Sequence, residues 1–271
     1  MIEKVNPSHP DKQVDRLCGA IVDYCYTQEE NPKVAVEALA GHGLVTVIVE
    51  SSVKVTSKVV KPIVDRIFGD DMTLKLISVP QDEHLADNQN NEVRTGDNGI
   101  FKGVPLSPEE IELSDIARWI YSKYPTDGKY ILDENIGKLI VCQSCCDSKV
   151  LENELKERYP QYEIVVNPLG DWTGGCNVDT GAVNRKLGSD MGSSGACTGG
   201  GINGKCFSKA DLTINLYAFL EAQRTGKKQE YFCAIGDTEI NGVPYSKMVK
   251  VAKEYVDKIG GFEELSSWGF V

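Results

Sequence analysis

The sequence has no apolar run that approaches the roughly 18 residues of a membrane-spanning helix. Basic residues are few: 29 stand against 40 acidic ones, and the net charge is −11. This shortage argues against a general nucleic-acid-binding surface. The first ten residues are polar and lack the apolar segment of a signal peptide, so no leader is expected. These absences predict a protein with neither nucleic-acid nor membrane partners.

The cysteine content excludes a simple disulfide framework. Nine cysteines, an odd number, are spread over 271 residues, and Cys18 and Cys25 lie in a helical pattern as small apolar residues. Such usage is typical of reduced thiols, so we expect a cytoplasmic protein. Apolar residues make up 41% of the chain and charged residues 25%, as in ordinary globular proteins.

Hydrophobic periodicity predicts an α-β-β-α-β order of elements that occurs twice and then once more in shortened form. The first copy comprises a helix at 12–26, strands at 34–40 and 44–55, a helix at 57–68 and a strand at 72–79. The second comprises a helix at 108–124, strands at 129–132 and 137–142, a helix at 148–158 and a strand at 162–166. The third comprises a helix at 208–224, strands at 230–235 and 240–244, and a helix at 247–258.

This pattern predicts an α+β fold of three pseudo-symmetric units, with sheets packed on helices and with reduced middle and C-terminal units. The expected boundaries are 1–103, 104–166 and 167–271. Polar and glycine-rich stretches at 80–100 and 167–207 read as long loops. Long loops inside compact proteins are usually functional, so we expect the chemistry in residues 1–12, 80–105 and 167–211.

The segment Ser8–Lys12 precedes the first predicted helix and permits two interpretations. Proline in the first turn, with aspartate near the positive end of the helix, is typical of an N-terminal cap. His9, Lys12 and the helix N-terminus could instead face phosphate, with Asp11 on Mg²⁺.

A second ambiguous segment, Gly199–Cys206, matches the GxxxxGK pattern of a phosphate-binding loop. Cysteine stands where that loop needs serine or threonine, and no strand precedes the segment. A flexible linker, or backbone that approaches a ligand closely, explains the glycines as well.

Further charged groups surround these loops. Ser208–Asp211 resembles a capping box, but Asp211 beside Lys205 and Lys209 could also hold a metal ion that bridges phosphates. Asp179 and Arg185-Lys186 follow two glycines and form either a solvated turn or a second charged group. Cys142, Cys145 and Cys146 lack a completing fourth ligand, which favours core packing over zinc.

Taken together, these segments resemble the S-adenosylmethionine synthetase (methionine adenosyltransferase) family, of which this chain looks like a short member. The resemblance is collinear over almost the whole chain and agrees with the three units expected above. It rests on His9–Lys12, Pro32–Glu37, Gly43–Glu50, Gly96–Gly99, Asp127–Lys129, Asn167–Gly175, Asp179–Gly181, Asn184–Lys186, Gly199–Lys205 and Ser208–Asp211.

The resemblance implies synthesis of S-adenosylmethionine from ATP and L-methionine. In this family the methionine sulfur attacks C5′ of ATP, and the released triphosphate is cleaved to pyrophosphate and phosphate. A thioether carries no proton, so this chemistry needs no general base. It needs positioning and neutralisation of a leaving group with about four negative charges, which lysine, arginine and metal ions supply.

The family roles transfer by position. The resemblance implies Mg²⁺, as a pair of ions per site, on Asp11 and Asp211, and K⁺ near Glu37. Catalytic or triphosphate-facing roles fall on His9, Lys129, Arg185, Lys186 and Lys205, with Asp97 near the reacting carbon. Methionine contacts fall on Glu50, Gln81, Asp179 and Lys209. ATP contacts also include Asp127, Asp179 and Trp172, although Asp171 stands where the family has arginine beside that aromatic residue.

Two alternatives remain open at this point. One is a non-catalytic, ATP-binding regulatory protein derived from the family, and the other is a P-loop phosphotransferase. The resemblance also implies a homodimer or a dimer of dimers with active sites at the subunit interface, since that family builds each site from two chains.

Overall fold

The computed structural model describes residues 1–88, 93–192 and 200–271. Its first unit consists of α1 (Pro10–Gln28), β2 (Val34–Gly41), β3 (Leu44–Ser51), α2 (Ser57–Phe68) and β4 (Thr73–Val79). β2 and β3 form an antiparallel hairpin, and β3 and β4 are parallel. β9 (Thr180–Ala182) adds to the free edge of β2, which gives the sheet order β4-β3-β2-β9.

The middle unit repeats this arrangement. It consists of α4 (Pro108–Lys123), β6 (Gly128–Asp133), β7 (Lys138–Gln143), α5 (Ser148–Arg158) and β8 (Glu163–Val166). β6 and β7 are antiparallel, β7 and β8 are parallel, and β1 (Ile2–Val5) adds antiparallel to β6. The order β1-β6-β7-β8 therefore matches that of the first sheet, with β1 in the place of β9.

The third unit is smaller. It consists of α7 (Ala210–Thr225), β10 (Gln229–Cys233), the hairpin of β11 (Glu239–Ile240) and β12 (Val243–Pro244), α8 (Tyr245–Ile259) and α9 (Phe262–Trp268). β10 pairs antiparallel with β5 (Gly99–Gly103). Two short helices, α3 (Glu83–Asn88) and α6 (Leu187–Met191), complete the described elements.

Of the four sheets in the described residues, the two four-stranded ones and the β5–β10 pair each contain a strand from another part of the chain. β1 precedes the first unit but pairs in the second sheet, while β5 pairs in the third sheet and β9 in the first. The predicted α+β fold of three related units is confirmed. The regions 80–105 and 167–211 contain β5, β9, α3 and α6, which were not predicted. The division of the chain at 103 and 166 stays a prediction.

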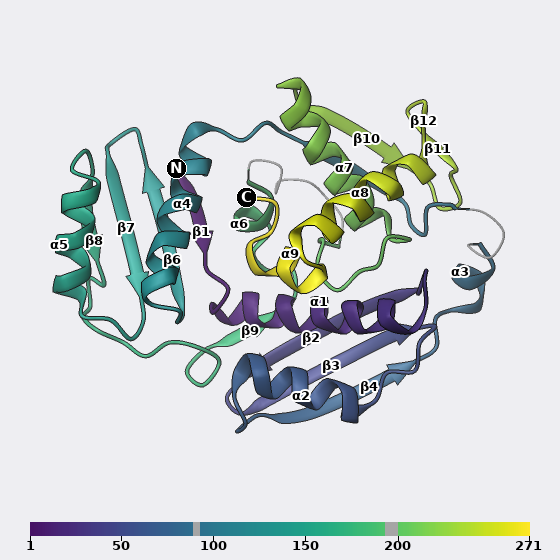
Figure 1. Cartoon of the computed structure of the whole chain (residues 1–271), viewed down its shortest axis with the longest axis horizontal. Coiled ribbons are helices and arrows are strands. Elements are labelled where there is room, and N and C mark those ends of the chain that lie inside the picture. The colour runs from purple at the N-terminus through teal and green to yellow at the C-terminus, as the bar shows by residue number, and fades with distance from the viewer. Residues whose placement is uncertain (89–92, 193–199) are drawn as a thin grey trace.

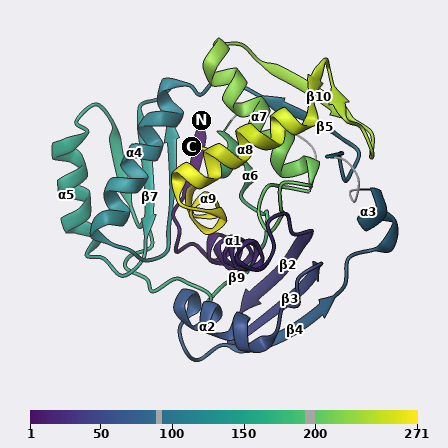
Figure 2. The ribbon, with the colours of Figure 1, turned by 45° about the vertical axis from the view of Figure 1, so that its right-hand side comes forward.

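Helices α1, α8 and α9 lie toward the middle of the molecule, with the two four-stranded sheets and the β5–β10 pair around them (Figures 1 and 2). The predicted helical stripe of α1 is buried and packs on β2 and α9. The approach to α9 is close, because a Cβ at Gly19 would lie 2.5 Å from the carbonyl oxygen of Phe262. This packing fixes α1, and with it the position of residues 9–12 at its N-terminus.

Candidate active site

The N-terminus of α1 begins with His9 as its capping residue. The Nδ1 atom of His9 accepts a hydrogen bond of 3.2 Å from the backbone N–H of Asp11, and Pro10 occupies the first turn. Burial, followed by the positive charge of Lys186, lowers the pKa of His9 to about 4. His9 is therefore neutral near pH 7. Because Nδ1 accepts, the proton resides on Nε2, which is left to donate to an anion.

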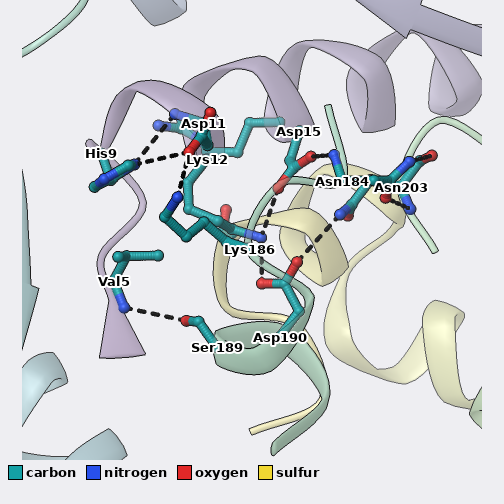
Figure 3. A network of polar contacts seen from close by, with 12 residues as sticks. Val5, His9, Asp11, Lys12, Asp15, Asn184, Lys186, Ser189, Asp190 and Asn203 are labelled. Atoms are coloured by element: carbon teal, nitrogen blue, oxygen red, sulfur yellow. Dashed lines mark hydrogen bonds and ion pairs between the residues drawn. The ribbon is translucent and has the colours of Figure 1, made fainter. Parts of the chain in front are cut away.

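Asp11 is nearly fully buried and lies between two chain segments. Its Oδ1 accepts from the backbone N–H of Ala182 at 2.8 Å, and its Oδ2 lies 2.6 Å from Nζ of Lys186. Nε of Arg185 lies 3.6 Å from Oδ1. Figure 3 shows the side chains of Asp11 and Lys186 facing each other. Asp11 is more than half of the chain away in sequence from Arg185 and Lys186, and the fold brings the three together.

Glycine is required where β9 crosses the start of α1. A Cβ at Gly181 would lie 2.1 Å from the carbonyl oxygen of Pro10 and 2.7 Å from the backbone nitrogen of Asp11. A larger residue would push β9 away and break the hydrogen bond from Ala182 to Asp11. The Asp-Thr-Gly segment of the sequence therefore serves a packing role at the site.

Asp127, Lys129 and Asp179 extend this group. Asp127 is buried and accepts a hydrogen bond of 2.9 Å from the backbone N–H of Gly175. Burial raises the pKa of Asp127 to about 6. The charges of Lys129 and Asp179 both act on His9, while Nζ of Lys129 also lies 2.7 Å from Oε2 of Glu3. The result is a charged surface of mixed sign around the start of α1.

Trp172 lies at the border of this surface. A Cβ built at Gly174 would lie 2.8 Å from both the Trp172 ring and the Asp127 side chain. The indole N–H donates to Oδ1 of Asn167 at 3.1 Å, which fixes the ring, and 36% of the residue is exposed. The neighbouring Asp171 accepts a hydrogen bond from the backbone N–H of Ser148 at 3.2 Å.

A second group of predicted residues lies at the start of α7. Nζ of Lys205 is 2.6 Å from Oδ2 of Asp211, and both residues are buried. Lys205 forms an isolated β-bridge with Ala35, and its charge acts on Glu37. Burial is the main cause of the raised pKa of Glu37, and the charge of Glu50 adds to it.

Two further predicted residues border this second group. The charges of Asp97 and Asp211 both act on Cys233, whose thiol donates to the carbonyl oxygen of Asp97 at 3.3 Å. Lys209 is the capping residue of α7 and is half-buried.

Gln81, which follows β4, has an unusual environment. Both polar atoms of its side-chain amide are buried, and within the described residues neither has a hydrogen-bond partner. Its position, two residues beyond Val79, places it near the end of β3 that carries Glu50, since Val79 and Glu50 are paired. A buried amide without partners costs free energy unless a ligand or water completes it. Gln81 is thus suited to bind a polar ligand.

The structure does not place Asp11 and Asp211 in the same group. The first group lies at the N-terminus of α1, whereas the Lys205 segment lies near Cys18, because a Cβ at Gly204 would be 3.2 Å from Cβ of that residue. Seven residues of helix separate Asp11 from Cys18, a rise of about 10 Å. One chain therefore presents two partial sites.

The glycine-rich segment is not a P-loop in the residues that the structure describes. Gly204 accepts from the backbone N–H of Val36 at 2.8 Å, and Cys206 donates to the carbonyl oxygen of Val34. Lys205 is thus part of a chain segment bonded to β2, with no strand–loop–helix geometry. Gly199, the first residue of the sequence match, lies outside the described residues.

The carboxylates fit a cation that is shared with substrate. Within residues 1–88, 93–192 and 200–271, no group of three or more His, Cys, Asp or Glu side chains is placed to hold a metal ion. Mg²⁺ in phosphate-transfer sites commonly binds one or two carboxylates and completes its shell with phosphate oxygens and water. The single carboxylates Asp11 and Asp211, each beside a lysine, match that pattern.

Comparison with known proteins finds one kind of relative. The model of the S-adenosylmethionine synthetase N-terminal domain matches residues 1–78. S-adenosylmethionine synthase of Helicobacter pylori (strain Shi470) is 25% identical over 264 residues, which cover 77% of this chain and 68% of the relative. S-adenosylmethionine synthase 1 of Rhodopseudomonas palustris (strain BisB18) is 24% identical over 266 residues, covering 78% and 69%.

A solved structure shares the fold over the whole chain. The unusual S-adenosylmethionine synthetase from Campylobacter jejuni superposes with a TM-score of 0.74 at 17% sequence identity, covering 100% of this chain and 93% of that one. Fold and site together define a three-unit α+β protein with cationic groups at two helix N-termini. The chain is therefore similar to the S-adenosylmethionine synthetases in its N-terminal sequence and in its fold.

Sequence reasoning missed the residues that hold these segments together. Asp15, Asp190 and Asn203 are buried beside the site and were not predicted. One signal for a buried polar network was available in the sequence. Asp15 is a charged residue one helical turn after Asp11, on the apolar face of the predicted helix. Asp190, which shares Lys12 with Asp15, is 175 residues away from it and could not be identified from spacing. Among the described residues, no helix is both long and apolar enough to span a membrane.

Proposed function

We propose that the protein synthesises S-adenosylmethionine from ATP and L-methionine. The observation that carries this proposal is the gathering of His9, Arg185 and Lys186 around Asp11 at the N-terminus of α1, in a chain of net charge −11. Two basic side chains beside a neutral imidazole N–H favour a polyanionic ligand in an acidic protein, and a helix N-terminus adds its own positive potential.

The proposed reaction matches these residue types. The methionine sulfur forms a bond to C5′ of ATP while the C5′–O bond breaks, and the electron pair leaves with triphosphate, which is then hydrolysed to pyrophosphate and phosphate. The sulfur gives up no proton, so catalysis consists of alignment and charge neutralisation. The N–H of neutral His9, the side chains of Lys129, Arg185 and Lys186, and Lys205 from the second group would supply that neutralisation.

The remaining assignments belong to the same proposal. Asp11 and Asp211 would hold Mg²⁺, which neutralises phosphate oxygens when bound, and Glu37 would lie by K⁺. Asp127 and Trp172 would contact ATP, and Asp97 would lie near the reacting carbon. The orphan amide of Gln81, with Glu50, Asp179 and Lys209, would contact methionine. A cytoplasmic location is part of this proposal, because the eight cysteines that the structure describes are free thiols.

The direct test is turnover of the purified protein with ATP, methionine, Mg²⁺ and K⁺. Formation of S-adenosylmethionine, with equal amounts of pyrophosphate and phosphate, supports the proposal. Omission of methionine serves as the control for hydrolysis of ATP alone. Binding of ATP without product would instead indicate a non-catalytic, ATP-binding protein and would overturn the proposed reaction.

We expect Trp172→Ala to weaken ATP binding more than methionine binding. The exposed ring beside Asp127 offers a face to the adenine base, and stacking of a base on an aromatic ring contributes about 1–3 kcal/mol. Calorimetric titration with a non-hydrolysable ATP analogue measures the effect. Trp119→Ala is the matched control, since Trp119 lies under Lys123 and Arg158 in the middle unit. Equal ATP affinity in wild type and Trp172→Ala would contradict the adenine assignment.

A homodimer is part of the proposal, because the first sheet has an uncovered apolar face. Helices α1 and α2 pack side by side on one face. The other face carries Leu39, Ile48, Ile77 and Val79, each 40–54% exposed. Ile48 and Ile77 are directly paired, so these side chains are contiguous. Exposed apolar patches of this kind mark interaction surfaces. A second copy would cover the face and bring the first group of one chain to the second group of the other.

Subunit mixing tests the shared site. Asp11→Asn and Asp211→Asn chains are each expected to be inactive, but a mixed dimer would carry both lesions in one site and none in the other. Random exchange makes about half of the dimers mixed, so about one quarter of wild-type activity should return. Native mass spectrometry verifies the exchange. Exchange without recovered activity, or a monomer in sedimentation, would contradict the shared site.

A further inference from the structure

Five residues beside the first group form a closed ring of polar contacts (Figure 3). Nζ of Lys12 lies 2.5 Å from Oδ1 of Asp190 and 3.1 Å from Oδ2 of Asp15. Oδ1 of Asp15 accepts from the backbone N–H of Asn184 at 2.8 Å. The Asn184 side chain bonds both backbone groups of Asn203, at 2.9 and 3.2 Å. Nδ2 of Asn203 donates to Oδ2 of Asp190 at 3.2 Å, which closes the ring.

The ring is shielded from solvent. Lys12, Asp15 and Asp190 are 0% exposed, Asn203 is 1% exposed, and Asn184 is half-buried. At this burial each charged group depends on its partners, because water does not replace them. Lys12 lies between the two carboxylates, which balance its charge. The ring therefore holds its members in one arrangement rather than in several alternative ones.

Each segment in the ring also carries a residue assigned to the triphosphate or its metal ions. Lys12 directly follows Asp11, Asn184 directly precedes Arg185, and Asn203 lies two residues before Lys205. Asp190 is further held from the C-terminal side, because its carbonyl oxygen accepts from the backbone N–H of Phe270 at 2.6 Å. The ring thus joins three segments that are far apart in sequence.

We propose that the ring of Lys12, Asp15, Asn184, Asn203 and Asp190 positions the triphosphate-facing residues, by fixing the Arg185–Lys186 turn and the Lys205 segment relative to the N-terminus of α1. This inference rests on the proposed function. The five residues of the ring do not touch substrate. They act through Asp11, Arg185, Lys186 and Lys205. Asp15 acts most directly, because its carboxylate accepts a hydrogen bond from the backbone N–H of Asn184, the residue before Arg185.

Four variants separate positioning from overall stability. Asn203→Ala opens the ring without changing its charge, and Asp190→Ala opens it and removes a carboxylate. Asp190→Asn is the conservative rescue. The side-chain NH₂ introduced by Asp190→Asn needs an acceptor in place of the Asn203 donor. Within the described residues Oδ1 of Asn203 has no hydrogen-bond partner, so it can accept from that NH₂ once the Asn203 amide is flipped. Ser189→Ala is the matched control, because Ser189 is also buried in α6 but bonds the backbone N–H of Val5 outside the ring.

The measurements are kcat and both KM values for S-adenosylmethionine synthesis, the affinity for Mg²⁺–tripolyphosphate by calorimetry, and the melting temperature. A misplacement of about 1 Å can cost about 100-fold in rate, so we expect kcat of Asn203→Ala to fall about 10- to 100-fold. Tripolyphosphate affinity should fall as well, whereas the KM for methionine should hardly change. Asp190→Asn should keep most of the wild-type kcat, and Ser189→Ala should lower only the melting temperature.

Two results would overturn the positioning role. One is a folded Asn203→Ala protein with wild-type kcat and tripolyphosphate affinity. The other is a loss in Ser189→Ala that matches the loss in Asn203→Ala, since a shared loss of stability would then explain both. If the wild-type protein forms no S-adenosylmethionine, the proposed function fails separately. The ring is then judged by tripolyphosphate affinity alone, and equal affinity or no binding in wild type and Asn203→Ala overturns it.

Discussion

Replacement of Asp11 or Asp211 by asparagine is expected to lower the rate of S-adenosylmethionine formation by about 10²- to 10³-fold, the usual cost of losing one electrostatic stabiliser. Each carboxylate lies in the first turn of its helix beside a lysine that faces the proposed triphosphate site. Asparagine keeps the shape and an acceptor for the backbone N–H of Ala182 but removes the charge. The measurement is kcat at saturating Mg²⁺, with circular dichroism to verify the fold.

Asp147→Asn provides the matched control for this prediction. Asp147 caps α5 and accepts from the backbone N–H groups of Lys149 and Val150, so it is also a carboxylate at a helix N-terminus. It lies outside the proposed site, and its replacement should leave kcat unchanged. A tenfold or smaller drop in both Asp11→Asn and Asp211→Asn would contradict the metal assignment.

Lys12→Met is expected to lower the free energy of unfolding by about 3–5 kcal/mol, because it leaves Asp15 and Asp190 buried without their shared cation. The matched control is Lys156→Met. Lys156 forms an exposed ion pair of 2.6 Å with Glu152 on α5, and an exposed pair contributes about 0–1 kcal/mol. Urea denaturation of both variants gives the difference. A loss as small as that of Lys156→Met would show that the buried ammonium contributes little.

The stability deficit of Lys12→Met should also depend on pH. Burial raises the pKa of Asp15 from its ordinary 3.8 to about 7 even though Lys12 lowers it. Without Lys12 the pKa of Asp15 rises further. Between about pH 4 and that pKa, Asp15 is therefore protonated in the folded variant but ionised in the unfolded chain. Stability falls with rising pH wherever the native state binds more protons. Denaturation at pH 5 and pH 8 should therefore show a larger deficit at pH 8, and a larger deficit at pH 5 would contradict this account.

Local sequence pattern was sufficient for the long elements and insufficient for the short strands. The β2–β3 hairpin and α1 have clear periodicity, and both were predicted within a few residues of their observed ends. β9 has three residues and β1 has four, so neither contains enough alternation to be recognised. Their strand conformation comes from pairing with β2 and β6, and such distant pairing leaves no mark on local sequence.

For the candidate site, the sequence by itself determined which residues carry charge and which segments contain them. Asp11, Arg185, Lys186, Lys205 and Asp211 were identified by their motifs, because ligand chemistry restricts the residue type at each position. Tertiary structure decided how they are grouped. Lys12 and Asp190 form a buried ion pair across 178 residues. Packing removes water from both partners, so each charge depends on the other, and burial is a property of the folded chain rather than of either segment.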